Sequence, residues 1–316
     1  MKIAIIGAGA MGSTVGGFFI RGGAEVYFVD PNKAHIDIVK KNGLQMDING
    51  EAQTLYPSGA FYHADEIHQK MDFVVIVTKG LYIESAIQGA LCLFDEQTAC
   101  MAIQNGMGNV DILSRYVDPK RIYASIVQLG ASMSAPGCVS VLKRDGARLS
   151  CGPVTQEEPT DKIRSVTELL THGGLDAFAL TRAEINLKIW YKMTANCTGN
   201  PCCALTRLPL GKFTNCPEGI EIKAGLLEEI LAVAEAEGVT GLREITTATN
   251  YWPEDNPMYR HIPSTAQDVR AKRKTEIDFL NGTIVRLGKK HGIPTPYNTM
   301  VTNFIHIIES NYDSMF

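Results

Sequence analysis

The chain has 316 residues, more than one hydrophobic core usually organises, so we expect two domains. Hydrophobic residues make up 45% and charged residues 20%, a globular composition that excludes a disordered chain. The net charge of -4 gives no basic field of the kind that indicates a nucleic-acid partner. No apolar run approaches the roughly 18 residues that a membrane span needs, and the N-terminal segment is too short for a signal peptide.

Eight cysteines are spread along the chain without any CxxC pair. A chain of this length does not need disulfides to stabilise its core. The adjacent Cys202 and Cys203 raise the alternative of a metal or redox site, but no histidine lies at the spacing of a metal finger. We therefore expect reduced, structural thiols, no bound metal and a cytoplasmic location.

The first half of the chain alternates short apolar runs with helical patterns. The apolar run at 73–77 is uninterrupted, which is typical of a strand buried on both faces. Alternation of strands with helices predicts a parallel, doubly wound α/β sheet. Strands are expected at 2–6, 25–29, 73–77, 99–103, 122–127, 140–142 and 148–151, and helices at 10–21 and 31–41.

The second half changes character from about Glu184 onward, because strand-like alternation nearly disappears. Long helical patterns take its place. We place a domain border near residue 180, so that residues 1–180 form the α/β domain and residues 181–316 an all-helical domain. Helices are expected at 185–200, 220–237, 242–252 and 265–291.

A glycine-rich turn follows the first strand and fits the pattern GxGxxG. Its first glycine allows a tight turn, the second lets the backbone approach a pyrophosphate, and the third lets the helix pack close to the sheet. The alternative is a glycine turn with no ligand. The position between an N-terminal strand and a helix favours a Rossmann-type dinucleotide site formed by Gly7, Ala8, Gly9, Ala10, Met11 and Gly12.

Asp30 ends the second strand, where a carboxylate accepts hydrogen bonds from the ribose hydroxyls and repels a 2′-phosphate. This charge favours NAD(H) over NADP(H). Two observations support other interpretations. Asp30 followed by Pro31 is also a good helix start, and Lys33 is close enough in sequence to meet a 2′-phosphate.

Three polar residues recur at steps of four in the helical pattern 185–200: Lys192, Asn196 and Asn200. This spacing places them on one stripe of a helix. Asparagine is a poor helix former, so its recurrence favours a functional face, with a solvated polar face as the alternative.

Further candidates lie in loops and at a helix start. Lys79 and Asn105 follow two predicted strands at their carboxyl ends, where open α/β sheets bind ligands. Alternatively, Lys79 is a solvated lysine and Asn105 part of a turn with Gly106. Ser264 with Gln267 forms a capping-box pattern, so Ser264 is a candidate N-cap of the helix 265–291. Glu276 within that helix is surrounded by basic residues, with which a surface ion pair is the alternative role.

These motifs together resemble the ketopantoate reductase (2-dehydropantoate 2-reductase) family over essentially the whole chain. The resemblance is carried in order by GAGAMG at 7–12, VTK at 77–79, QNGMG at 104–108, WYKMTANCTGNP at 190–201, PSTAQDVRAKRKTEIDFLNG at 263–282 and GIPTP at 292–296. The spaced set is specific to that family, whereas the glycine motif alone is not.

The resemblance implies a role for each matching residue. Lys192 matches the catalytic lysine that donates a proton to the 2-keto oxygen, and Glu276 the acid that helps to poise that lysine. Asn105, Asn196, Asn200 and Ser264 match substrate-binding groups, and Lys79 matches a lysine of the cofactor–substrate cleft. Asn105 is also expected close to the nicotinamide, as a cofactor-binding residue.

The implied activity is NAD(P)H-dependent reduction of ketopantoate to pantoate, with a small 2-oxo acid as the partner and a homodimer left open. Pantothenate-pathway members commonly carry a basic residue where this chain has Asp30, so an NAD-dependent D-2-hydroxyacid dehydrogenase acting on other branched or aromatic 2-oxo acids is the alternative. A nucleotide-sensing regulator and a 6-phosphogluconate-type or opine-type dehydrogenase are further alternatives. Residues 250–261, rich in Tyr, Trp and Pro, are expected to line the variable substrate wall.

Overall fold

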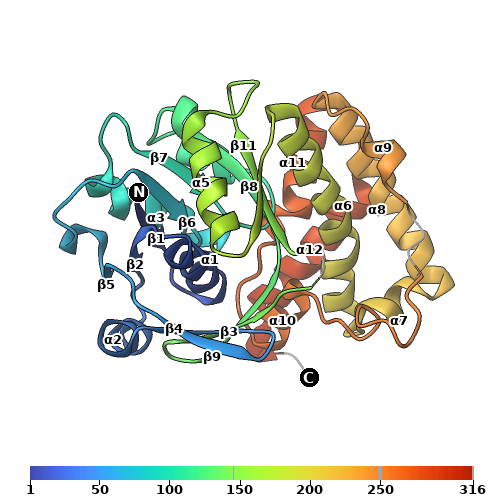
Figure 1. Ribbon diagram of the computed structural model, residues 1–316. Helices are drawn as coiled ribbons and strands as arrows, with labels where there is room; N and C mark the ends of the chain where they lie inside the picture. The colour runs from blue at the N-terminus through green and yellow to red at the C-terminus, as the bar shows by residue number, and fades with distance from the viewer. Residues whose placement is uncertain (145, 248–250, 315–316) are drawn as a thin grey trace. The chain divides into compact units, whose positions relative to one another are not determined.

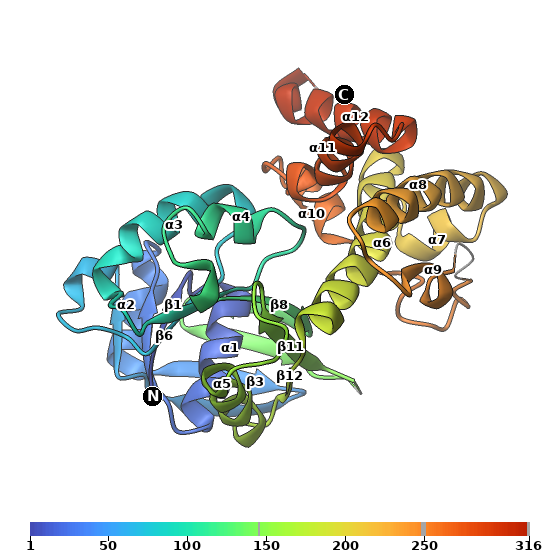
Figure 2. The same ribbon diagram turned by 90° about the horizontal axis from the view of Figure 1, so that it is seen from above.

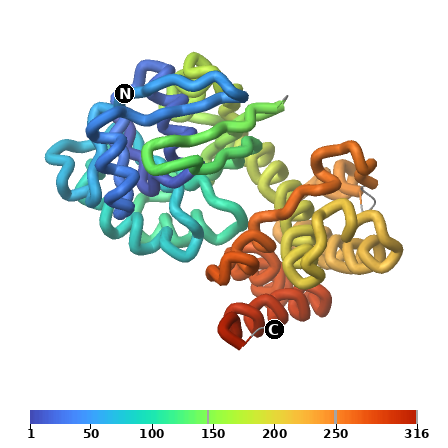
Figure 3. Tube along the Cα trace, turned by 90° about the horizontal axis from the view of Figure 1, so that it is seen from below, coloured from blue at the N-terminus to red at the C-terminus, as the bar shows by residue number. Residues whose placement is uncertain are grey.

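The computed structural model describes residues 1–144, 146–247 and 251–314. The chain divides into two compact units. Unit 1 comprises residues 1–104 and 109–185, and unit 2 comprises residues 105–108 and 186–316. Figures 1 and 3 follow the chain by colour from the N-terminus to the C-terminus. The loop 105–108 therefore belongs to unit 2, which a single border near residue 180 does not anticipate.

Unit 1 is built on a large sheet. Among the described residues, eight strands lie in the order β12-β11-β8-β7-β6-β1-β2-β5. Neighbours pair in parallel, except for β8 and β11, which pair antiparallel. The prediction of a doubly wound parallel sheet is confirmed. The bounds are β1 Lys2–Ile6, β2 Glu25–Val29, β5 Gly59–Phe61, β6 Phe73–Ile76, β7 Ala99–Ala102, β8 Ile122–Gln128, β11 Arg148–Pro153 and β12 Asp176–Ala179.

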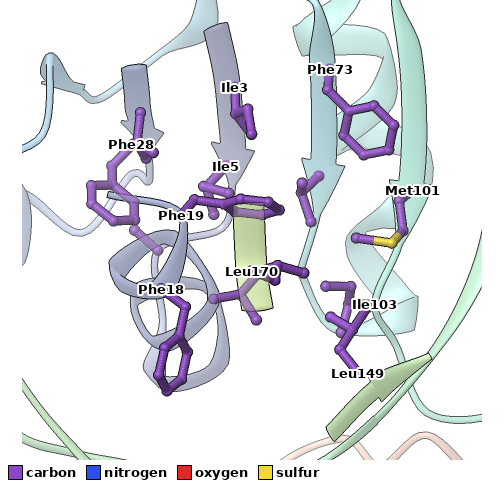
Figure 4. Packing of buried hydrophobic residues seen from close by; sticks show 14 of the residues in the cluster. Ile3, Ile5, Phe18, Phe19, Phe28, Phe73, Met101, Ile103, Leu149 and Leu170 are labelled. Atoms are coloured by element: carbon purple, nitrogen blue, oxygen red, sulfur yellow. The ribbon is translucent and has the colours of Figure 1, made fainter. Parts of the chain in front are cut away.

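Helices cover both faces of this sheet, because successive side chains of a strand point to opposite faces. Ile3 and Ile5 of β1 pack in one core with Phe18 of α1 and Leu170 of α5 (Figure 4). Ala4 and Ile6 join a second core with residues of α3 and α4. The helices of unit 1 are α1 Ala10–Arg21, α2 Lys33–Asn42, α3 Ile83–Ala90, α4 Asn109–Leu113 and α5 Asp161–His172.

A second, smaller sheet in unit 1 has the strand order β4-β3-β10-β9. It packs on α1, since Met46 and Val139 lie in the same core as the α1 side chains. Only part of β10 was expected from the sequence. Its partner strands are short and half exposed, so they lack a continuous apolar pattern. The bounds are β3 Leu44–Ile48, β4 Glu51–Leu55, β9 Gly130–Ala135 and β10 Cys138–Leu142.

Unit 2 is helical within the described residues, as predicted for this half of the chain (Figure 2). Its core gathers Trp190 and Met193 of α6, Ile230 of α8 and Ile284 of α11. No helix formed by the described residues is long and apolar enough to cross a membrane. The helices are α6 Arg182–Thr206, whose first residues belong to unit 1, α7 Leu210–Thr214, α8 Pro217–Ala236, α9 Leu242–Ile245, α10 Ser264–Arg270, α11 Asn281–His291 and α12 Pro296–Ser310.

Two of the predicted helices are longer than the helices that the structure shows. The helix expected at 265–291 is broken into α10, a 3-10 turn at Ile277–Phe279 and α11. The break begins where Lys272 adopts a left-handed φ of 51°, after which Glu309 accepts hydrogen bonds from the backbone N–H and hydroxyl of Thr275. The helix expected at 242–252 ends at Ile245 in α9, and residues 248–250 lie outside the described residues.

Candidate active site

The glycine-rich turn connects β1 to α1 in unit 1. Gly7 adopts a left-handed φ of 97°, and its N–H donates to the carbonyl of Val29 at 2.8 Å. A Cβ on Gly12 would lie 1.8 Å from the Gly7 oxygen, so only glycine permits this approach of helix to turn. Gly9 is exposed, and a Cβ there would meet no atom within 4 Å. The turn therefore has the shape that a pyrophosphate requires at a helix N-terminus.

Asp30 follows β2, the strand beside β1. Its Oδ1 accepts a hydrogen bond from the N–H of Asn32 at 2.8 Å. Asn32, and not Asp30, is the N-cap of α2, and the helix begins at Lys33, so the alternative in which Asp30 caps the helix and Pro31 opens it was wrong. Lys33 places its amine 5.7 Å from the ring centre of Tyr62. A carboxylate that does not cap the helix suits a ribose hydroxyl.

Two further polar groups lie where β6 and β7 end, next to each other in the sheet. Thr78 Oγ1 and Gln104 Oε1 are buried and have no hydrogen-bond partner within the described residues. Gln104 is held in place because its Nε2 donates to the carbonyl of Ile76 at 2.8 Å. Buried polar atoms in proteins are normally paired, so these two oxygens suit the donors of a bound ligand. Both residues lie in the motifs VTK at 77–79 and QNGMG at 104–108, although neither was singled out as a site residue. Lys79, half-buried at the start of a 3-10 turn, follows Thr78 in the chain.

The residues of unit 1 therefore fit a dinucleotide. They offer a glycine turn in which a Cβ on Gly12 would clash, and a carboxylate at the end of β2. They also offer two buried oxygens without hydrogen-bond partners among the described residues, at the ends of β6 and β7. No cluster of His, Cys, Asp or Glu suited to a metal ion occurs among the residues that the structure describes.

In unit 2, Lys192, Asn196 and Asn200 lie along α6, and all three are half-buried rather than exposed. This burial does not suit the alternative of a solvated polar face. Burial lowers the pKa of Lys192 to about 8, and the charge of Glu276 partly opposes that shift. A lysine with this pKa exchanges its proton near neutral pH, as a general acid must.

Glu276 lies at the start of the 3-10 turn Ile277–Phe279, not inside a helix as expected. Two of the four basic residues before it have other partners: Arg273 pairs with Asp268, and Lys272 lies 4.0 Å from Asp313. The charge of Glu276 acts instead on Lys192. Glu276 is half-buried, and this burial together with its effect on Lys192 favours a role beside that lysine over a surface ion pair.

The loop 105–108 is fastened to the same turn. The N–H of Met107 donates to the carbonyl of Phe279 at 2.8 Å. A Cβ on Gly106 would lie 2.2 Å from that same oxygen, and its φ is 87°, so the contact requires glycine. Asn105, half-buried at the start of this loop, is thereby tied to the turn that begins at Glu276.

Ser264 is the first residue of α10 and is exposed, and its hydroxyl makes no hydrogen bond within the described part of the chain. The N-cap is Pro263, and the Gln267 side chain donates to the carbonyl of Ile262 instead of closing a capping box. The N-cap alternative for Ser264 was therefore wrong. Its hydroxyl remains available to a ligand.

Asn281 is a residue of this unit that sequence reasoning missed. Pro201 lies inside α6 and has no N–H to donate to the carbonyl of Cys197, four residues earlier. The fully buried Asn281 supplies the missing donor through Nδ2 at 3.0 Å and also donates to Asn298 Oδ1 at 2.9 Å. An Asn-Pro pair in a helical pattern signals such an unpaired carbonyl, but sequence alone does not reveal which side chain serves it.

Comparison with known proteins agrees with these features. The family model described as "Ketopantoate reductase PanE/ApbA" matches residues 3–155, and that of the C-terminal part of the same family matches residues 184–309. A 2-dehydropantoate 2-reductase of Lactococcus lactis is 29% identical over 97% of both chains. A solved PanE/ApbA-family ketopantoate reductase of Ralstonia eutropha is 28% identical, with a TM-score of 0.84 over 99% of this chain and 100% of the other.

Another similar structure is D-mandelate dehydrogenase in a ternary complex with NADH and anilino(oxo)acetate. It is 27% identical, with a TM-score of 0.87 over 100% of both chains. Two models of one family thus account for most of the sequence, and solved members share the fold from end to end. The chain belongs to the ketopantoate reductase family of NAD(P)-dependent oxidoreductases.

Proposed function

We propose that this protein reduces the C2 carbonyl of a 2-oxo acid, with ketopantoate as the substrate and pantoate as the product. The observation that carries the proposal is the environment of the Lys192 amine. Burial lowers its pKa to about 8, and the charge of nearby Glu276 opposes that shift. The same helix carries two half-buried asparagines. Residues 1–180 would serve as the dinucleotide-binding domain and residues 181–316 as the substrate and catalytic domain.

In this proposal the reaction needs one hydride and one proton. Bound NAD(P)H supplies the hydride. The Lys192 ammonium donates its proton to the carbonyl oxygen as negative charge develops there, and it stabilises that charge until the proton has moved. Glu276 keeps the amine protonated near neutral pH, because its charge raises the pKa that burial lowers.

The polar groups of unit 2 would hold the substrate. Asn196 and Asn200 lie on the Lys192 stripe, Asn105 is tied to the turn of Glu276, and the Ser264 hydroxyl has no protein partner among the described residues. Amide and hydroxyl donors of this kind bind a carboxylate and a neighbouring hydroxyl. Within the proposed wall 250–261, residue 250 lies outside the described residues, and Tyr251 is exposed.

Asp30 supports NAD(H) as the preferred cofactor, and the glycine turn, Lys79 and Asn105 would complete the cofactor site. A carboxylate at this position accepts ribose hydroxyls and repels a 2′-phosphate. The substitution D30N keeps an acceptor but removes its charge, so it should lower kcat/KM for NADH about five- to tenfold, because hydrogen bonds to charged groups are stronger than those to neutral ones. A wild-type preference for NADPH would contradict this use of Asp30.

A second candidate is an NAD-dependent D-2-hydroxyacid dehydrogenase acting on another branched or aromatic 2-oxo acid. The similarity to D-mandelate dehydrogenase bound to NADH favours it, together with Asp30. The two candidates share their chemistry and differ only in the side chain of the substrate.

One assay tests both candidates. The purified protein is given NADH or NADPH with ketopantoate, 2-oxoisovalerate, 2-oxoisocaproate or phenylpyruvate, and kcat/KM is compared. The first candidate predicts the highest value with ketopantoate, and the second predicts it with another acid. Dinucleotide binding without reduction of any of the four would contradict both and support a nucleotide-sensing regulator.

A further inference from the structure

A buried histidine lies between the two segments of the proposed dinucleotide site. His35 is 1% exposed and occupies the first turn of α2, directly after the segment that carries Asp30. Asn32, the N-cap of that helix, accepts the backbone N–H of His35 at 3.3 Å. His35 therefore belongs to the segment that carries Asp30, on the ribose side of the proposed site.

The hydrogen bonds of His35 define its tautomer. The backbone N–H of Gly137 donates to Nδ1 at 3.0 Å, and because a backbone N–H can only donate, Nδ1 carries a lone pair. The ring proton is therefore on Nε2, which donates to the Ser13 hydroxyl at 3.2 Å. Burial lowers the pKa of His35, against an opposing effect of the Asp30 charge, so this neutral form is the favoured one.

The hydrogen bonds from Gly137 through His35 and Ser13 form a relay that ends in the glycine-rich turn. Ser13 donates its hydroxyl proton to the carbonyl of Ala8 at 2.8 Å. A trans peptide is planar, so its carbonyl and its N–H point in opposite directions. A carbonyl of Ala8 that points toward Ser13 turns the N–H of Gly9 away from Ser13. An N–H facing outward from this turn is the donor that a pyrophosphate needs.

The other end of the relay is equally fixed. Gly137 lies between β9 and β10 with a left-handed φ of 74°, and a Cβ there would lie 2.2 Å from Cγ2 of Ile38. Only glycine lets the hairpin approach α2 closely enough to donate to His35. The hydrogen bonds therefore run in one direction from the hairpin, through His35 and Ser13, to Ala8.

We propose that His35 and Ser13 are positioning residues for dinucleotide binding, which hold the Ala8–Gly9 peptide in the orientation that binds the pyrophosphate. The inference rests on the proposed dinucleotide-dependent function. It adds that the affinity for the cofactor depends on a hydrogen-bond relay that does not itself touch the cofactor.

The test compares variants by titration calorimetry with NAD⁺ and NADP⁺ and by steady-state kinetics. S13A and H35A should each weaken dinucleotide binding about fivefold or more, the effect of one lost hydrogen bond, with kcat at saturating dinucleotide within about twofold of wild type. H35Q, whose amide can donate to Ser13, should recover part of the affinity. S13A alters the fewest atoms and carries the test if H35A does not fold.

A matched control separates positioning from general destabilisation. Val39 is 1% exposed, on the same helix, and takes no part in the relay. V39A should lower the melting temperature by creating a cavity yet leave the dinucleotide Kd unchanged. The inference is overturned if S13A and H35A weaken binding no more than V39A does. A wild-type protein that binds neither dinucleotide would overturn the proposed function as well, so the two failures are distinguishable.

Discussion

The substitution N281A should destabilise unit 2, because it removes the side chain that donates to the Cys197 carbonyl in place of the N–H that Pro201 lacks. Asn281 Nδ2 donates to the carbonyl of Cys197 at 3.0 Å and to Asn298 Oδ1 at 2.9 Å. Both acceptors lose this donor when the side chain is removed. A buried polar group left without a partner costs about 1–3 kcal/mol.

The net cost is smaller than the sum of the two losses. Oδ1 of Asn281 has no partner within the described residues, so N281A also removes one unsatisfied atom. Two acceptors are orphaned and one is removed, which leaves a net destabilisation of about 1–3 kcal/mol. Urea unfolding monitored by circular dichroism measures this change. N303A, on the exposed surface of α12, is the control and should change stability by less than about 0.5 kcal/mol.

A second substitution shows which acceptor is responsible. P201A gives residue 201 an N–H that can donate to the carbonyl of Cys197 within α6. N281A should therefore cost less in the P201A background, by about 1 kcal/mol or more. Strictly additive effects of the two substitutions would refute the argument that Asn281 replaces the donor that proline lacks.

Further predictions concern the proposed site. S264A should raise KM for the 2-oxo acid several-fold without lowering the melting temperature, because Ser264 does not cap its helix; a lower melting temperature with unchanged KM would contradict this. G12A should weaken dinucleotide binding at least about tenfold or prevent folding, since its Cβ would lie 1.8 Å from the Gly7 oxygen, whereas G89A, with no atom within 4 Å, should be tolerated. The rate of carbonyl reduction should fall as pH rises through about 8, because Lys192 then loses its proton. E276Q should move that midpoint to lower pH, because Glu276 raises the pKa of Lys192. An unchanged midpoint would contradict an electrostatic effect of Glu276 on Lys192.

The sequence predicted the parts of the fold that rest on strong local patterns. The elements β1, α1 and β2 have the predicted bounds, because buried Val/Ile runs and a glycine motif define them. Apart from part of β10, the small sheet of unit 1 was missed because β4 and β9 are short and largely exposed, and because β3 pairs with β10 over a long sequence separation. The break after α10 was missed because it depends on Glu309, which no local pattern connects to Thr275.

The candidate site shows the same division. Lys192, Asn196 and Asn200 were predicted from a spacing of four residues, which a helix converts directly into one face. The attachment of the loop 105–108 to Phe279 was not predictable, since it joins segments far apart in sequence through a backbone hydrogen bond. The relay of His35 was also missed, because a lone histidine in an amphipathic helix has no distinctive pattern.

The role of Lys192 as proton donor is tested most directly by turnover of K192A with its best 2-oxo acid. A saturating dinucleotide and a measured dinucleotide Kd separate chemistry from cofactor binding. K188A, one turn earlier on α6, is the matched control and should stay within about threefold of wild type. We expect K192A to bind the dinucleotide normally and to lose at least about a hundredfold in kcat. A K192A variant that turns over at a near-normal rate would contradict the account.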